Sequence, residues 1–170
     1  MKYLKSYNES INFENSYNYK VKGTTEHIDK DGDKYNKFLY TFIDNNDRKY
    51  YVRLTSWEIN YASFSADFQT EEEYLNDQQN KTDILDIKYP DTNRFDAFRV
   101  LSTVFRIIKD FYEYNIKTLN NFIFVTDDIK RRNIYKSIIN KIFPAWKLIK
   151  DEKDIDGTWH IEYDFDNKLS

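Results

Sequence analysis

The chain has 170 residues, a formal net charge of −3, and hydrophobic and aromatic shares of 40% and 18%. A chain of this length can bury a core without disulfides or metals, so we expect a single folded domain. The absence of cysteine excludes disulfides and thiolate nucleophiles, and because no apolar run approaches the roughly 20 residues of a bilayer span, we expect no membrane partner.

Residues 1–16 are expected to form an N-terminal segment, followed by one domain over residues 17–170. Leu4, Tyr7 and Ile11 recur at helical spacing, which predicts a short amphipathic helix or a targeting peptide. The alternation in residues 17–22 predicts a first strand.

Three further strands are predicted at residues 37–44, 49–58 and 61–68. The first two are rich in aromatic and β-branched residues and lie at hairpin distance. The third alternates strictly, with Tyr61, Ser63, Ser65 and Asp67 on one face and Ala62, Phe64, Ala66 and Phe68 on the other. Together these segments predict an antiparallel meander.

The C-terminal half begins after an acidic stretch, residues 69–92, with a short helix near Glu71–Asn76. Residues 93–115 predict a long helix with one apolar face, capped by Asn93. The almost wholly apolar residues 121–126 predict a buried central strand.

A second long helix is predicted from Asp127 or Asp128 to about Phe143, where Pro144 blocks its continuation. Two last strands follow at residues 146–150 and 158–165. The order β-β-β-β-α-β-α-β-β predicts an α+β fold with a mixed, mostly antiparallel sheet and two main helices. The helix at 93–115 lets the strands on either side of it lie parallel through a right-handed crossover.

From Lys37 to Phe165 this order resembles the GCN5-related N-acetyltransferase (GNAT) fold. The segment Arg132-Asn133-Ile134-Tyr135-Lys136 is similar to the family segment in which a tyrosine acts as general acid. The resemblance implies Tyr135 as that acid, and Glu58 as a candidate base at the end of a meander strand. It also implies acetyl-CoA as cofactor, bound near Asn93 and Arg94. In that family the central strand and its parallel neighbour separate to admit the pantetheine arm.

The start of the first long helix departs from the family's Q/R-x-x-G-x-G/A motif. Arg94 matches the leading residue, but residues 95–99 contain no glycine. The rings of Phe95 and Phe98 stand where backbone N–H groups would approach the pyrophosphate, and Asp96 adds negative charge there. We therefore expect a GNAT-like scaffold that has lost, or never had, the cofactor, and we favour a non-catalytic protein over an acyltransferase.

A second resemblance is to small proteins of tailed bacteriophages. It is carried by the N-terminal residues MKYLKSYNES, by the helix Phe98–Phe111, and by the spacing of Arg131 and Tyr135. This resemblance implies a bacteriophage accessory or virion-associated protein that acts by binding a protein partner. It would act in the bacterial host cytoplasm or be packaged in the virion. In large-capsid phages such N-terminal segments resemble prohead-targeting peptides cleaved after Glu, and Glu9 or Glu14 would be the residue here.

Two alternatives stay open: an N-acetyltransferase with atypical acetyl-CoA binding, and a nucleic-acid-binding protein. Residues 129–150 contain seven basic residues and no acid. Their candidate contacts with an anion or nucleic acid are Lys130, Arg131, Arg132 and Lys136. A solvated helix face is favoured over a nucleic-acid contact because the chain is not basic overall.

No metal site is expected from the sequence. The two histidines, His27 and His160, belong to no metal-binding motif. Residues 29–33 (DKDGD) resemble the start of a calcium loop, but Lys34 and Tyr40 stand where such a loop needs glycine and glutamate. A turn between strands is expected instead.

Overall fold

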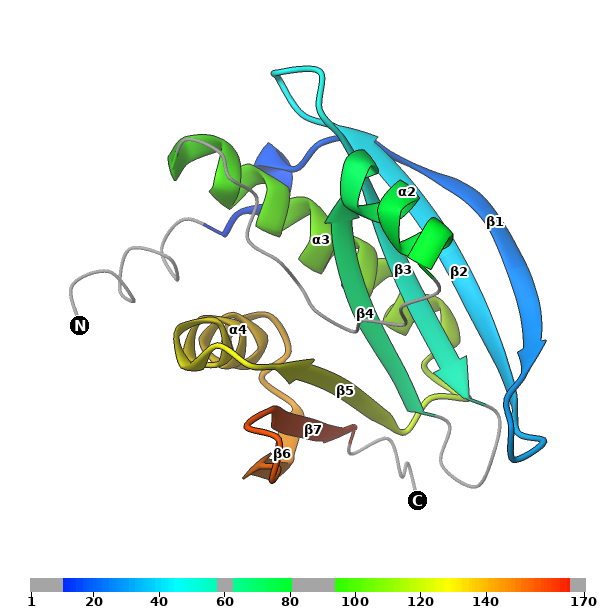
Figure 1. Ribbon diagram of the computed structural model, residues 1–170. Helices are drawn as coiled ribbons and strands as arrows, with labels where there is room; N and C mark the ends of the chain where they lie inside the picture. Colours follow the sequence, from blue (N-terminus) through cyan, green and yellow to red (C-terminus); the bar gives the residue numbers. More distant parts are fainter. Residues whose placement is uncertain (1–10, 58–62, 81–93, 166–170) are drawn as a thin grey trace.

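The computed structural model describes residues 11–57, 63–80 and 94–165. Its strands are β1 (Tyr19–Ile28), β2 (Lys34–Ile43), β3 (Lys49–Trp57), β4 (Ser63–Thr70), β5 (Asn121–Thr126), β6 (Trp146–Lys153) and β7 (Trp159–Phe165). They form one open seven-stranded sheet in the order β1-β2-β3-β4-β5-β7-β6 (Figure 1). Only the β4–β5 pair is parallel, and the other five neighbouring pairs are antiparallel.

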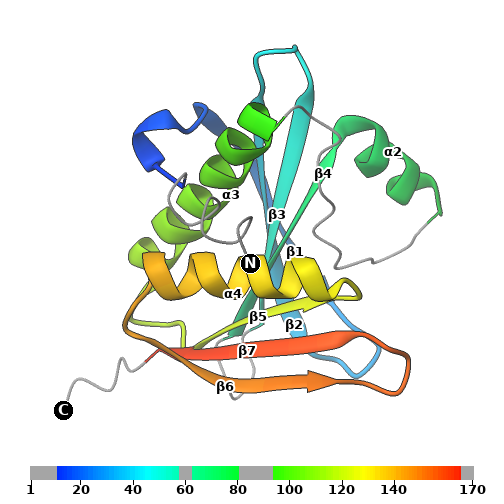
Figure 2. The ribbon, with the colours of Figure 1, turned by 90° about the vertical axis from the view of Figure 1, so that its left-hand side faces the viewer.

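The helices are a short 3-10 helix η1 (Phe13–Asn15), α2 (Glu71–Asn80), α3 (Arg94–Asn115) and α4 (Ile129–Ile142). Both α3 and α4 cover the same face of the sheet, whereas α2 lies on the opposite face over β3 and β4 (Figures 1 and 2). The ring of Tyr74 on α2 stacks on Tyr51 of β3, with centroids 4.2 Å apart. Within the described ranges, no helix is long and apolar enough to cross a membrane.

The α+β class, the mostly antiparallel sheet and the parallel pairing of the fourth and fifth strands are confirmed. The first strand was predicted too short, since β1 continues to Ile28 and pairs with β2 along its whole length. The Asp29 carboxylate closes this hairpin by accepting hydrogen bonds from the backbone N–H groups of Asp31 and Asp33. The segment that resembles a calcium loop is therefore a hairpin turn, as expected.

The residues around η1 pack on α3. The backbone N–H of Asn12 donates to Ser102 Oγ at 3.3 Å, and that of Tyr17 donates to Thr103 Oγ1 at 2.8 Å. Ile11 is 8% exposed and joins the core. Residues 11–16, which we expected in the N-terminal segment, thus contact the domain. Residues 1–10, including Glu9, lie outside the described residues, whereas Glu14 lies in η1.

An aromatic cluster fills the core beneath the junction of β4 and β5. Phe64 of β4 is fully buried, and its ring centre lies 4.9 Å from Phe122 of β5 and 5.2 Å from Phe111 of α3. Trp146 and Phe165 complete the contacts of this ring from β6 and β7, at 6.4 and 5.9 Å. The cluster therefore ties α3 to strands from both halves of the sheet.

Replacing Phe64 with alanine should lower the free energy of unfolding by about 3–5 kcal/mol, because it removes a buried ring and leaves a cavity among four other rings. Urea denaturation of both proteins measures this. The matched control is Tyr114→Ala on α3, a residue 90% exposed, which should change stability by no more than about 0.5 kcal/mol. Equal losses in the two variants would contradict the central place of Phe64.

Candidate functional site

The sheet opens between β4 and β5. Their parallel register runs through Ser63–Asn121 and Phe64–Phe122 and ends at Ser65–Ile123. Beyond this point β4 stays paired with β3 as far as Thr70, and β5 stays paired with β7 as far as Thr126. Each strand thus follows its antiparallel partner, and the two parallel strands separate.

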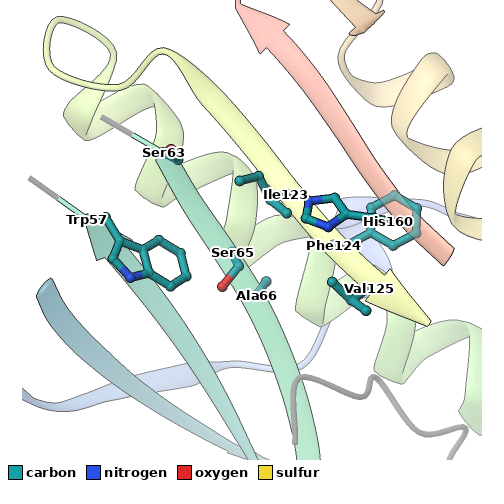
Figure 3. A pocket seen from close by; sticks show the side chains of 8 residues that line it. All are labelled: Trp57, Ser63, Ser65, Ala66, Ile123, Phe124, Val125 and His160. Carbon is teal, nitrogen blue, oxygen red and sulfur yellow. The ribbon is translucent and has the colours of Figure 1, made fainter. Parts of the chain in front are cut away.

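A pocket of about 260 Å³ lies at this opening (Figure 3). We call it the β4–β5 pocket. Side chains of four strands line it: Trp57 of β3, Ser63, Ser65 and Ala66 of β4, Ile123, Phe124 and Val125 of β5, and His160 of β7. Figure 3 shows Trp57 and His160 on opposite sides of the pocket, with Ser65 between them.

The lining residues come from both faces of the sheet. Ser65 and Ile123 belong to the face opposite α3 and α4, whereas Ala66 and Phe124 alternate with them and point toward the helices. The ring of Phe124 packs against Tyr135 of α4, with centroids 6.0 Å apart. Because Ala66 and Phe124 also line the pocket, its floor reaches into the gap between the two strands.

The described lining residues with polar side-chain atoms are few: Trp57, Ser63, Ser65 and His160. Ser65 is 3% exposed, and its Oγ has no hydrogen-bond partner among the described residues. A buried hydroxyl without a partner costs free energy, and native proteins seldom leave one in this state. The Ser65 hydroxyl is therefore a buried polar group beside the pocket that lacks a hydrogen-bond partner among the described residues.

An ion pair lies on the same sheet face as Ser65, two residues further along β4. Arg53 Nε of β3 donates to Asp67 Oδ2 at 2.8 Å, and both side chains are largely buried, at 12% and 2% exposed. The two charges compensate each other. Neither residue lines the pocket, and none of the described lining residues is Asp, Glu, Lys or Arg.

The residues that the acetyltransferase resemblance implied do not come together within the described part of the chain. Tyr135 is 1% exposed and packs between Phe105 and Phe124 on the helix side of the sheet. Glu58 and Asn93 lie outside the described residues. Arg94 is the first residue of α3, and its side chain lies outside the described part of the chain.

Three of the four candidate anion contacts form ion pairs within the fold. Arg132 and Lys136 both bind the Asp151 carboxylate of β6, with Arg132 Nε 2.7 Å from Oδ1. The Arg132 guanidinium also lies 4.1 Å from the ring centre of Trp159. Arg131 Nε is 3.8 Å from an oxygen of Asp128, and Lys130, the fourth candidate, is exposed on the first turn of α4. The local positive charge is thus partly neutralised by residues of the same domain.

Asp151 titrates abnormally in this cluster. Burial works against its ionisation, but the hydrogen bonds and positive charges of Arg132 and Lys136 outweigh burial and hold the pKa of Asp151 below its ordinary value. A carboxylate with a lowered pKa in the folded state stabilises the fold above its unfolded-state pKa. This contribution is lost as the pH falls through the lower pKa of the folded state.

Sequence reasoning missed Ser65 as a site residue. The strict alternation of residues 61–68 does place Ser65 on the polar face of its strand. No sequence signal indicates that the parallel pairing ends at Ser65, or that its hydroxyl is left without a partner.

No protein-family model, no curated protein and no solved structure matches the chain. The function is therefore inferred from the residues of the site. In the described ranges, no group of three or more His, Asp or Glu side chains is placed to hold a metal ion.

Replacing Asp151 with asparagine should lower the free energy of unfolding at pH 7 by about 1.5–3 kcal/mol, the usual contribution of hydrogen bonds to charged groups. The difference from the unmodified protein should shrink as the pH falls below about 3.8, the ordinary carboxyl pKa. Urea unfolding at pH 7 and at pH 3 measures both effects.

The control for this variant is Glu152→Gln, which changes the next carboxylate along β6. Glu152 has a 70% exposed side chain, 3.7 Å from Lys150, and its replacement should change stability by no more than about 0.5 kcal/mol. A loss for Asp151→Asn that does not vary with pH would contradict the lowered pKa.

Proposed function

We propose that this chain is a non-catalytic binding protein on a GNAT-like scaffold, and that its ligand occupies the β4–β5 pocket. The observation that carries the proposal is the separation of β4 and β5 after three residue pairs, with an apolar pocket of about 260 Å³ at the point where they part. Ligand sites in proteins are concave and mostly apolar, with a few polar groups that orient the ligand.

The GNAT-like scaffold is supported by the arrangement of the elements. The meander β1–β4 leads through α3 to a parallel β5, and α4 then leads to the closing pair β6 and β7. The same order of elements is typical of the GNAT fold, and the opening lies between the two strands that separate in that family.

We propose that the protein is not a catalyst because the candidate general acid is not placed to reach a ligand in the pocket. A general acid must lie within hydrogen-bond distance of the group that it protonates, and Tyr135 is 1% exposed among aromatic rings. No carboxylate is among the described residues that line the pocket. The three glycines of the sequence lie in β1 and in two hairpin turns, at Gly23, Gly32 and Gly157, so none can open α3 to a pyrophosphate.

An N-acetyltransferase with atypical acetyl-CoA binding is the second candidate, and the same opening is the observation that favours it. An acyl group could enter the pocket while the rest of the cofactor is held elsewhere on the surface. Nucleic-acid binding has less support, because Arg131, Arg132 and Lys136 already pair with carboxylates.

Isothermal calorimetry with acetyl-CoA separates the first two candidates. We expect no binding heat and no thermal shift, because the start of α3 lacks the glycines that admit a pyrophosphate. Binding tighter than about 100 µM, roughly −5.5 kcal/mol, would overturn the non-catalytic proposal in favour of the acyltransferase. Repeating the titration with Val125→Phe, which narrows the pocket, would then tell whether the acyl group enters it.

We further propose that the protein is a bacteriophage accessory protein that binds a protein partner and is carried in the virion. The support is the resemblance of MKYLKSYNES and of the α3 sequence to phage proteins. Mass spectrometry of purified virions should detect the chain at a stoichiometric level. Its absence from purified particles would remove the virion part of the proposal and leave an accessory role in the host cytoplasm.

A further inference from the structure

We propose that the β4–β5 pocket takes a small, uncharged aromatic molecule with one hydrogen-bonding group, of the phenol type, and that Ser65 is its hydrogen-bond partner. This inference rests on the proposed binding function of the same pocket, and it names the chemical class of the ligand. Three features of the pocket carry it: its charge, its rings and the buried Ser65 hydroxyl, which has no partner among the described residues.

The charge of the pocket indicates an uncharged ligand. None of the described lining residues carries a permanent charge, and the nearby Arg53 and Asp67 are bonded to each other at 2.8 Å. A carboxylate or phosphate entering this apolar space would lose its hydration without gaining a cation. A neutral molecule avoids that cost.

The rings of the pocket indicate an aromatic ligand. Trp57 and His160 flank it from two sides, and Phe124 contributes to its floor (Figure 3). Aromatic rings gain from stacked or edge-to-face contacts beyond the burial of apolar area. A cavity of about 150 Å³ is already enough for benzene, so about 260 Å³ leaves room for a ring and one substituent.

The Ser65 hydroxyl indicates one hydrogen-bonding group on the ligand. Ser65 Oγ is buried in the wall between Trp57 and the β4–β5 gap and has no partner among the described residues. A serine hydroxyl can donate or accept a hydrogen bond, so it can accept from a phenolic O–H or donate to the phenolic oxygen. A phenol that bonds to the Ser65 hydroxyl gains a hydrogen bond that an apolar ligand of the same shape cannot make.

Two-dimensional ¹⁵N NMR titration of the full chain tests the proposal with four probes: phenol, benzene, benzoate and cyclohexanol. We expect saturable shifts of the β4 and β5 amides around Ser65 and Ile123 with phenol, weaker binding of benzene and cyclohexanol, and no saturation with benzoate. Each of the other probes differs from phenol in one respect: benzene lacks the hydroxyl group, cyclohexanol lacks the aromatic ring, and benzoate carries a negative charge.

Two variants locate the contacts. Ser65→Ala should weaken phenol binding by about 2- to 10-fold, the range for one neutral hydrogen bond, and leave benzene binding unchanged. This variant should fold at least as stably as the unmodified protein, because the hydroxyl that it removes has no partner in the described part of the chain. Val125→Phe should abolish binding of both probes, whereas the same change at Val21, a residue of β1 that is 63% exposed, should leave it intact.

The outcomes separate the ligand class from the binding function. Benzoate or cyclohexanol binding as tightly as phenol would overturn the inference, as would equal effects of Ser65→Ala on phenol and benzene. Binding of an aliphatic amide such as butyramide at the same amides, without phenol, would overturn the inference and leave the proposed binding function in place. If none of these probes shifts the β4 and β5 amides, the pocket itself is not a binding site and the proposed function fails.

Discussion

Three residue pairs, Ser63–Asn121, Phe64–Phe122 and Ser65–Ile123, join β4 to β5. They are the only strand pairing between the half-sheet β1–β4 and the half-sheet β5–β7–β6 in the described part of the chain. The half-sheets are also joined by the aromatic cluster below, where Phe64 meets rings from α3, β5, β6 and β7. Because such interiors are close-packed, the cluster fixes how the half-sheets meet and therefore where the sheet opens.

The sequence predicted those elements whose side chains alternate or are continuously apolar. β5 was recognised from its apolar run, and β4 from the alternation of serines with Phe64, Ala66 and Phe68. The second half of β1 was missed because almost all its side chains are exposed and mixed in polarity, so no apolar period indicates it. The pairing of the α4 cations was also missed: Asp151 lies one residue beyond the basic segment, and only the return of β6 brings it beneath Arg132 and Lys136.

The site was less predictable than the fold because it depends on a competition between strand partners. β4 keeps β3 as its partner to Thr70 and β5 keeps β7 to Thr126, and the parallel pairing is the one that ends early. Antiparallel pairing is slightly more stable per residue, which is consistent with this outcome. The point at which β4 and β5 separate depends on the pairing of the whole sheet, so it cannot be predicted from the sequence of either strand alone.

The two outer edges of the sheet are poor places for a partner to add a strand. β1 carries exposed Lys20 and Lys22 and a register shift between Val21 and Gly23, and β6 likewise carries lysines and a shift between Leu148 and Lys150. Charged side chains and bulges are the means by which natural sheets block edge-to-edge pairing. Between β4 and β5, by contrast, the described sheet opens on a space of about 260 Å³ with mostly apolar walls. This inner opening, rather than either outer edge, is therefore where the ligand that we propose would bind.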